Sequence, residues 1–293
     1  MSRAERDADG SDRAFALLQD VLPQHALSKL MHRLARSTRP WLRTALIRSV
    51  MRAYPAIDMK EAADPDPFAY PSFNAFFTRA LRPGARPVAS GERELASPVD
   101  GTVSQLGTIR EGELLQAKGV RYTAAALLAD EAAAAKYAGG GFACLYLAPW
   151  NYHRIHMPLA GRLAATRYVP GALYSVNDAT ARAVPGLFAR NERVVCEFDT
   201  TLGPLAMVLV GALFVGSIET VYAGEINPPA ARGGRVRSVE AGIGTDFAKG
   251  AELGRFNMGS TVVLLLGNGG TQFGGHLGPG STVRMGQPLA TVG

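Results

Sequence analysis

Short apolar runs separated by turn-forming residues dominate the chain beyond residue 100, and they limit the folds it can adopt. The runs cover residues 142–148, 193–198, 207–215 and 262–266, and another begins at Val103. Gly, Pro and Asp-Gly stand between them, and the chain contains 33 glycines. Because apolar runs of this length between turn residues are typical of buried strands, the pattern predicts a β-rich domain with many tight turns.

Two further patterns refine this fold class. Residues 122–137 (YTAAALLADEAAAAKY) have the composition of a helix, and segments 249–256 and 285–292 each place a Gly turn before a short strand. Such an echo occurs in barrel-sandwich modules of the biotinyl and lipoyl type, where it indicates fold alone. We therefore expect an α+β, β-rich fold with a barrel-sandwich-like antiparallel catalytic core.

One uncharged segment, residues 200–218, has to be tested as a membrane span. Its strongly apolar part, LAMVLVGALFVGSI, has 14 residues, whereas a span needs roughly 20. We expect two buried strands broken at Gly211 instead. The first residues, MSRAERDADGSDRA, lack the apolar core of a signal peptide. Cys144 and Cys196 lie in apolar segments without a CxxC, so we expect buried thiols in a reducing compartment.

The positive charge is concentrated near the N-terminus. The formal net charge is +6, and residues 21–57 contain seven Lys or Arg and no Asp or Glu. Leu27, Leu30, Met31 and Leu34 form one apolar helical face, and a second pattern of this kind follows Trp41. Basic amphipathic helices suit an anionic membrane surface, the reading we favour over helices that only pack on the body. No nucleic-acid motif accompanies the charge.

The stretch RFNMGSTVVLLL, residues 255–266, places a Gly-Ser pair at the entry to an apolar run. A hydrolase nucleophile would instead stand in GxSxG at a strand-to-helix turn. The Ser260 hydroxyl is suited to attack the carbonyl carbon of Gly259, because glycine has no Cβ to crowd the cyclic intermediate. Elimination from the resulting ester cuts the chain, and hydrolysis then leaves an N-terminal pyruvoyl group. A second GSTV occurs at residues 280–283, but Ser281 follows Pro-Gly, and we assign it a structural role.

Asp100, His153 and His156 are the candidate partners of Ser260. Asp100 lies in SPVDGTV at an expected strand end, where an Asp-Gly hairpin turn is the structural alternative. His153 and His156 fall together in YHRIHMP, where a metal pair is an alternative that lacks a third ligand. A histidine oriented by a carboxylate would activate the serine, which suggests an Asp100–His156–Ser260 relay. The polar residues of segments 168–177 and 188–195 could line a pocket or form ordinary loops.

Five motifs in order resemble bacterial phosphatidylserine decarboxylases. They are SPVDG, YHRIHMP, FARNERV, GSIET and MGST, and the similarity runs from about residue 40 to residue 292. In that family Leu most often precedes the Gly-Ser-Thr motif, whereas Met258 stands here.

The resemblance implies a proenzyme that cuts itself between Gly259 and Ser260. The large chain (1–259) and the small chain (260–293) would stay together as a heterodimer, which could dimerise further. Asp100 and His156 match the charge relay for cleavage, and Ser260 becomes the covalent pyruvoyl cofactor and Schiff-base site. His153 matches a residue near the substrate, as proton donor or substrate contact. No metal is implied.

The resemblance also sets the expected activity and location. The enzyme would be a carboxy-lyase that converts phosphatidylserine to phosphatidylethanolamine and CO₂ in phospholipid biosynthesis. We expect residues 1–60 to hold a disordered start and the basic helices, and residues 61–293 to form the catalytic domain. The protein would lie on the cytoplasmic face of the cell membrane as a peripheral protein, with anionic lipid as its partner.

Three other classes of protein remain as alternatives. A serine hydrolase would stay one chain and react with a fluorophosphonate. A soluble pyruvoyl amino-acid decarboxylase would cut itself but would not need the basic helices. A barrel-sandwich carrier would present a modifiable Lys at a hairpin tip, which the echo segments lack.

Overall fold

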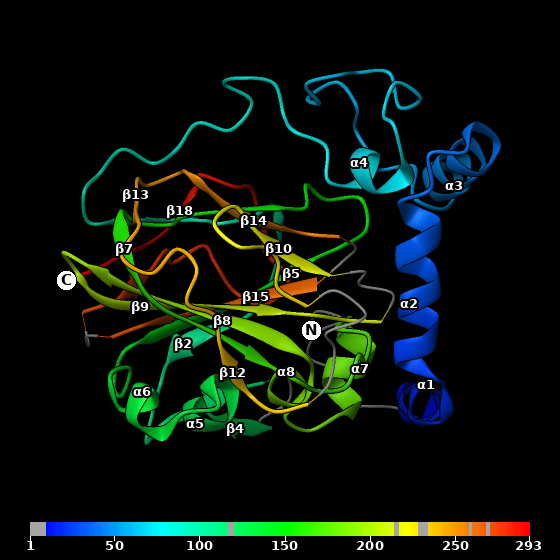
Figure 1. Cartoon of the computed structure of the whole chain (residues 1–293). Helices are drawn as coiled ribbons and strands as arrows, with labels where there is room; N and C mark the ends of the chain where they lie inside the picture. Colours follow the sequence, from blue (N-terminus) through cyan, green and yellow to red (C-terminus); the bar gives the residue numbers. More distant parts are fainter. Residues whose placement is uncertain (1–9, 117–119, 214–216, 228–233, 258–259, 268–269) are drawn as a thin grey trace.

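The computed structural model describes residues 10–116, 120–213, 217–227, 234–257, 260–267 and 270–293. A large central sheet carries smaller sheets on one face and short helices on the other, and three longer helices stand at one side of the body (Figure 1). The expected α+β, β-rich class with N-terminal helices is confirmed.

The central sheet is antiparallel throughout its named strand pairs. Within the described residues its spatial order is β12 (Arg237–Ser238), β7 (Gly161–Val169), β8 (Arg193–Thr200), β9 (Gly203–Val210), β15 (Ser260–Leu266), β5 (Gly141–Leu147), β2 (Gly101–Thr108) and β17 (Thr282–Val283), with β13 (Asp246–Phe247) also paired to β7.

The middle strands are buried on both faces, which explains their unbroken apolar sequences. In β15, Val262 and Leu264 enter the core on one face, while Val263 and Leu265 enter the core on the other. A strand that is half exposed would alternate with polar residues, whereas one covered on both faces reads as a continuous apolar run.

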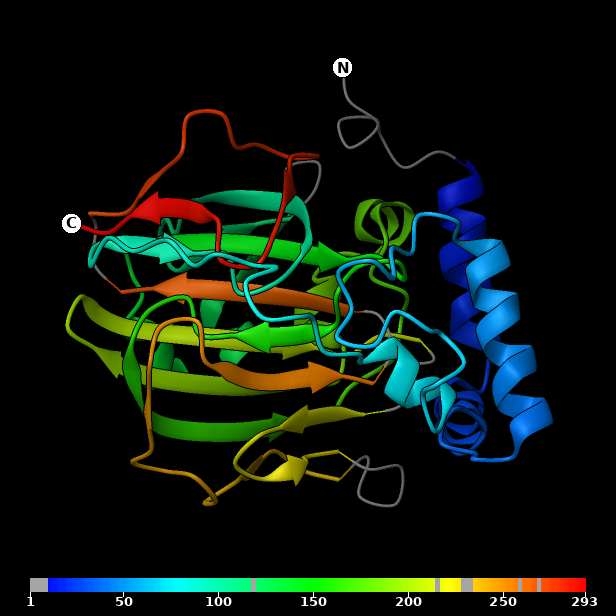
Figure 2. The same cartoon turned by 90° about the horizontal axis from the view of Figure 1, so that it is seen from above.

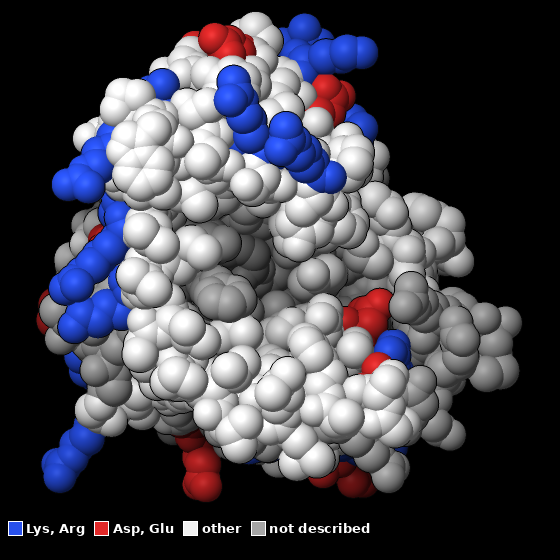
Figure 3. All heavy atoms as spheres, turned by 90° about the vertical axis from the view of Figure 1, so that its right-hand side faces the viewer, with Lys and Arg blue, Asp and Glu red and all other residues white. Residues whose placement is uncertain are grey.

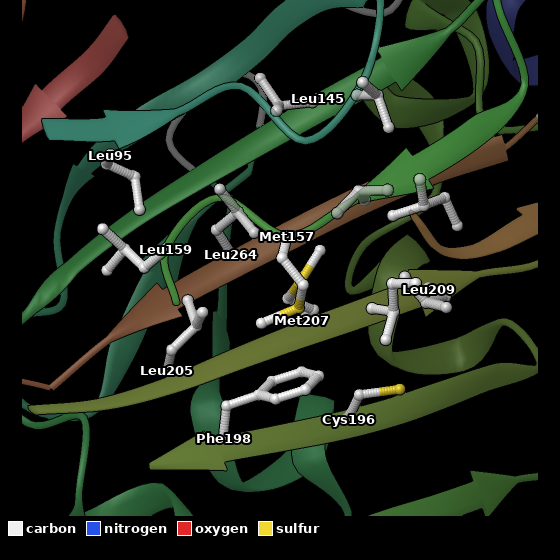
Figure 4. Close-up of a cluster of buried hydrophobic side chains, with 14 of the residues drawn as sticks. Leu95, Leu145, Met157, Leu159, Cys196, Phe198, Leu205, Met207, Leu209 and Leu264 are labelled. Atoms are coloured by element: carbon white, nitrogen blue, oxygen red, sulfur yellow. The ribbon is translucent and has the colours of Figure 1, made fainter. Parts of the chain in front are cut away.

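Smaller sheets cover one face of the central sheet. One contains β1 (Glu94–Ala96), β18 (Pro288–Thr291) and β16 (Gln272–Phe273), and another contains β11 (Gly224–Glu225), β10 (Ile218–Thr220), β14 (Glu252–Phe256) and β6 (Arg154–His156). Figure 4 shows the apolar layer between the central sheet and these smaller sheets, where Met207 and Leu264 of the central sheet approach Met157 and Leu159. The described strands thus form a sandwich of antiparallel sheets, and none of these sheets closes into a barrel.

Short helices cover the opposite face of the central sheet (Figure 1). They are α5 (Ala124–Leu128), α6 (Glu131–Ala135), α7 (Asp178–Ala183) and α8 (Leu187–Arg190), and they lie beside the hairpin of β3 (Glu113–Leu115) and β4 (Arg121–Thr123).

The single helix expected over residues 122–137 is wrong. Tyr122 belongs to β4, and α5 stops where Ala129 takes a left-handed conformation with φ of 53°. The Asp130 side chain then accepts from the backbone N–H of Ala133 at 2.9 Å and starts α6. An Asp favours a helix start over a helix interior, so the alanine-rich composition did not decide the outcome.

The N-terminal helices pack at one end of the sandwich (Figure 2). They are α1 (Gly10–Val21), α2 (Gln24–Ala35), α3 (Pro40–Ala53) and the short α4 (Phe73–Phe77). Ile47 of α3 and Phe76 of α4 share a small separate core. The two expected basic helices are α2 and α3, whereas α1 was not predicted. The expected disordered start falls on residues 1–9, which lie outside the described residues.

The uncharged segment 200–218 leaves the sheet at the predicted glycine. β9 ends at Val210, and the Gly211 N–H donates to the carbonyl of Glu192. Among the described residues the next strand is β10, which begins at Ile218; the expected second strand falls partly on residues 214–216, which lie outside the described residues. In the described part of the chain, no helix has both the length and the apolar character needed to cross a bilayer. Cys144 and Cys196 are buried and unpaired with each other, as predicted.

Candidate active site

Ser260 is the first residue of β15 and is fully buried. Because side chains alternate along a strand, it shares the face of Val262 and Leu264, which is the face covered by β6 and β14. Its hydroxyl has no hydrogen-bond partner among the described residues. Buried hydroxyls are usually bonded. Ser28, Tyr137, Thr261 and Thr271 also have buried, unbonded hydroxyls in the described part of the chain, so it is the Gly-Ser-Thr motif that sets Ser260 apart from them.

The start of β15 faces the N-terminal helices. Figure 2 shows β14 and β15 in orange running in opposite directions, with the end of β14 and the start of β15 nearest the helices. Asn257, just after β14, is held by two hydrogen bonds to Ser217 and by one from the Asn74 side chain of α4. Gly259, where the cut is expected, and its neighbour Met258 lie outside the described residues.

His153 is fully buried and stacks on Phe77 of α4, with ring centroids 4.1 Å apart. Its Nδ1 lies 2.8 Å from the carbonyl oxygen of Asn151. Because a carbonyl can only accept, Nδ1 carries the proton and Nε2 carries a lone pair. That Nε2 atom is buried and has no partner in the described part of the chain. Burial lowers the His153 pKa to about 3, so the ring is neutral at pH 7.

His156 ends β6 and is held at both ring nitrogens. Nδ1 lies 2.8 Å from the carbonyl oxygen of Gly250 and must donate to it, so Nε2 is again the basic atom. The Tyr152 hydroxyl lies 3.0 Å from that Nε2 and donates to it. Burial lowers the pKa of His156, and the nearby carboxylates Glu252 and Asp100 oppose this effect. The nearby Arg154 further lowers the pKa of His156, and Arg79 does the same to the pKa of His153.

Asp100 directly precedes β2 and is buried. Arg86 donates to both of its carboxylate oxygens, and the backbone N–H of Met285 donates to one of them at 2.8 Å. The following Gly101 is not a hairpin glycine. A Cβ there would lie 2.5 Å from the carbonyl oxygen of Tyr146, so glycine is needed for the close approach of β2 to β5.

The structure brings the segments of the expected relay together without joining their side chains. The backbone N–H of His156 donates to the carbonyl oxygen of Pro98, two residues before Asp100. No hydrogen bond between the Asp100 carboxylate and the His156 ring occurs in the structure, because Arg86 holds the carboxylate and Gly250 holds Nδ1. Within the described residues, no group of three His, Cys, Asp or Glu side chains could hold a metal ion.

Several residues of this site were missed by reasoning from the sequence. Arg86 and Arg79 stand in no recognised motif, and Asn257 is an ordinary polar residue before a strand. Tyr152 is the exception, because it lies within YHRIHMP, one residue before His153. A signal existed there, since a tyrosine four residues from a histidine on one short segment can reach its ring.

Arg193 and Asn191 of segment 188–195 have structural roles, whereas Tyr174 of segment 168–177 lines a pocket beside the start of α2. The Arg193 guanidinium donates to four carbonyl oxygens, including those of Leu127 and Ala189. Asn191 bridges the carbonyl oxygens of Tyr174 and Gly211. Ser281 precedes β17 and accepts from the N–H of Gly278 at 3.0 Å, in agreement with its expected turn role.

Comparison with known proteins decides the family. The family profile described as phosphatidylserine decarboxylase matches residues 73–291, and a second profile, described as PSD, matches residues 14–55. The chain belongs to the phosphatidylserine decarboxylase family.

Curated members of this family match almost the full length of the chain. A phosphatidylserine decarboxylase proenzyme of Methylococcus capsulatus is 49% identical over 280 residues, covering 95% of this chain and 96% of that protein. The proenzyme of Alkalilimnicola ehrlichii is 51% identical, covering 90% and 91%. That of Shewanella sp. strain ANA-3 is 52% identical, covering 96% and 97%. The family resemblance inferred from five motifs is therefore confirmed.

The four candidate residues lie within the region that matches the phosphatidylserine decarboxylase profile. Asp100, His153, His156 and Ser260 all lie inside residues 73–291. The second profile covers most of α1 and all of α2 and α3.

Proposed function

We propose that this chain decarboxylates phosphatidylserine to phosphatidylethanolamine after cutting itself between Gly259 and Ser260. The products of the cut would be a large chain (1–259) and a small chain (260–293) that remain paired. One observation carries the proposal. The Ser260 hydroxyl is buried at the start of a central strand and is unbonded among the described residues, within a family whose curated members are named proenzymes.

Self-cleavage needs a base for the Ser260 proton, and we assign this role to His156, which matches the family's charge relay and has Asp100 nearby to favour its protonated form. Its Nε2 lone pair accepts the proton as the serine oxygen bonds to the Gly259 carbonyl carbon. The imidazolium then gives that proton to the Ser260 nitrogen as the Gly259–Ser260 C–N bond breaks. The Asp100 carboxylate, held by Arg86, stabilises the imidazolium through space. In the uncut chain the Tyr152 hydroxyl occupies Nε2, so it must move aside before the proton arrives.

The ester then becomes the cofactor. Removal of the Ser260 Cα proton breaks the ester C–O bond, which frees a Gly259 carboxylate and leaves dehydroalanine. Hydrolysis of dehydroalanine releases ammonia and leaves a pyruvoyl group at residue 260. Once formed, the pyruvoyl ketone supplies an electron sink for the bond to the departing carboxylate. The buried, unbonded position of Ser260 fits such a group, because no hydrogen bond has to be given up when the hydroxyl is lost.

His153 is the proposed substrate contact. Its Nε2 lone pair can accept a proton from the substrate amine, which has to be uncharged to react. The low pKa keeps this atom unprotonated before substrate arrives. An anionic substrate beside the ring would raise the His153 pKa, so the ring would hold the proton only while substrate is bound.

We further propose that α1, α2 and α3 bring the enzyme to an anionic membrane surface as a peripheral protein, on the cytoplasmic face. Figure 3 views the side on which these helices lie, and shows a mainly uncharged, hollowed face with Lys and Arg along its upper and left margins. Large apolar side chains are exposed on these helices, among them Leu17, Leu30 and Trp41, the last at 67%. Exposed apolar groups beside basic ones suit the boundary between lipid headgroups and acyl chains.

A decarboxylase assay tests this function. Wild-type protein should release CO₂ from phosphatidylserine labelled at the serine carboxyl, presented in detergent micelles, and should form phosphatidylethanolamine. Ser260→Ala should release none. Free serine should be a poor substrate, which separates this enzyme from a soluble amino-acid decarboxylase. Equal turnover of free serine and phosphatidylserine would contradict the assignment to lipid.

A further inference from the structure

Arg79 is a buried cation that the chemistry proposed above does not use. It follows α4 and is only 4% exposed. Within the described residues its guanidinium forms no hydrogen bond or ion pair, and its Nε atom is fully buried without a partner. Its one ring contact is with Phe76, 5.6 Å from the ring centroid. Buried charges are normally paired, because an unpaired one loses its hydration without compensation.

The guanidinium borders a cavity of about 180 Å³ beside the active site. Trp150, Asn151 and Tyr152 line the same cavity, and they directly precede His153. Arg79 lies close enough to His153 to depress its pKa. The cavity therefore adjoins the histidine that we assign to the substrate amine.

The other charged residues of the cavity already have partners. Arg86 pairs with Asp100 and Glu61, and Arg284 pairs with Glu61. Asp58 is exposed, and its carboxylate accepts the backbone N–H of Lys60. Asp58 and Asp100 attract the Arg79 guanidinium but form no ion pair or hydrogen bond with it among the described residues. Arg79 is thus the cation that remains for a ligand among the described cavity residues.

We propose that Arg79 binds the phosphodiester anion of the lipid headgroup, an inference that rests on the proposed function. A guanidinium presents several N–H groups in one plane, a geometry that suits phosphate oxygens. The substrate also carries a carboxylate. A cation on that group would stabilise the ground state and oppose loss of CO₂, because the charge leaves the carboxylate during the reaction. The phosphodiester keeps its charge throughout, so binding it costs nothing in the chemical step.

Binding of a product analogue distinguishes a phosphodiester contact of Arg79 from a carboxylate contact. Glycerophosphoethanolamine contains the phosphodiester and the amine but no carboxylate. In Arg79→Met both the KM for phosphatidylserine micelles and the inhibition constant of glycerophosphoethanolamine should rise by about 10- to 100-fold, the value of a charge-assisted hydrogen bond. Arg79→Lys keeps the charge without the fork and should give smaller rises. Arg82→Met removes an exposed arginine nearby and should leave both constants within about twofold of wild type.

The thermal midpoint of unfolding serves as the control on folding. Removing an unpaired buried charge should leave the thermal midpoint of Arg79→Met unchanged or raised. A lower midpoint with unchanged constants would show a structural role and overturn the proposal. A raised KM with an unchanged inhibition constant would show a carboxylate contact and also overturn it. If Arg79→Met does not fold, an unchanged inhibition constant in Arg79→Lys is the contradicting result. A failure of the proposed function would appear differently, as a wild-type protein without decarboxylase activity.

Discussion

Arg86 donates to both carboxylate oxygens of Asp100, from Nε at 2.9 Å and from a terminal nitrogen at 2.5 Å. The two side chains are 6% and 10% exposed, so this is a buried, two-point ion pair. It holds the Asp100 carboxylate two residues after Pro98, whose carbonyl oxygen accepts the backbone N–H of His156. The Asp100 carboxylate is therefore held by an arginine. It makes no hydrogen bond to the ring of His156, the histidine that it was expected to orient.

Breaking this pair should cost stability. Arg86→Met leaves the Asp100 carboxylate buried without its cation, and should lower the free energy of unfolding by about 3 kcal/mol or more. Adding Asp100→Asn removes the stranded charge. The double variant should therefore lose less unfolding free energy than the sum of the losses in the two single variants. Urea unfolding in a Ser260→Ala background, which keeps the chain whole, would measure the coupling. Simple additivity would show that the ion pair contributes nothing.

The two histidines should separate in their effects on cleavage and turnover. His156→Ala should slow self-cleavage by roughly 100-fold or more, because the serine loses its base, and Asp100→Asn should slow it as well. His153→Ala should cut within about tenfold of the wild-type rate but lose most decarboxylase activity. Gel electrophoresis of freshly synthesised protein would give the cleavage rates. An uncut His153→Ala together with a normally cut His156→Ala would exchange the two roles.

Stability should fall in mild acid because of His153. The folded pKa of about 3 lies below the unfolded value of about 6.5, so the unfolded state binds more protons between these values. Stability from this group is complete above the unfolded value and is lost as the pH falls towards 3. From pH 7.5 to pH 5 the loss should be about 2 kcal/mol, and the depressed pKa of His156 acts in the same direction.

His153→Asn provides the matched control for this pH effect, because its amide nitrogen takes the place of Nδ1. The amide N–H₂ can still donate to the Asn151 carbonyl but does not titrate over this range. Urea unfolding at both pH values should therefore show a loss in this variant that is smaller by about 2 kcal/mol. An identical loss in both proteins would place the acid sensitivity elsewhere.

The strands of the core could be predicted from the sequence because their burial leaves a direct pattern. β15 and β5 are covered on both faces, so nearly every position is apolar. The helix expected over residues 122–137 failed because one local hydrogen bond, from the Ala133 N–H to Asp130, outweighed the composition. α1 was missed because many of its apolar residues, such as Leu17 and Leu18, are exposed and it shows no strong buried face.

The candidate site was predictable only in its reactive residues. Asp100, His153, His156 and Ser260 were found because their residue types and motifs indicate chemistry. Arg86 lies 14 residues before Asp100, and Gly250 lies 94 residues after His156. Neither contact follows a helix or strand repeat, so no local pattern in the sequence predicts it. The Tyr152 hydroxyl on His156 depends on the conformation of one short segment.

Charge reversal on the N-terminal helices should weaken membrane binding. Arg33 and Arg39 are exposed, whereas Arg36 bonds to Glu225 and Arg43 donates to the Tyr70 carbonyl. Changing Arg33 and Arg39 to Glu should therefore test the surface without disturbing the fold. The loss should be about 2 kcal/mol or more, which is 30-fold in partitioning onto anionic vesicles, and salt should reduce the difference. Sedimentation with vesicles would measure it.

The matched control reverses Arg110 and Arg235, which are exposed outside these helices. This variant should bind vesicles nearly as well as wild type. Trp41→Ala should weaken binding by an amount that salt does not change, because it removes an apolar contact. Both charge variants should still cut themselves. Full binding by the Arg33 and Arg39 variant would place the lipid-facing surface elsewhere.

Intact mass spectrometry of the purified protein tests the central claim most directly. Self-cleavage predicts two chains, residues 1–259 and residues 260–293. The small chain should be lighter than its sequence by the mass of ammonia, because its first residue has become a pyruvoyl group. Ser260→Ala should give a single chain of the full mass. A wild-type preparation that is active on phosphatidylserine and consists of one uncut chain would contradict the account.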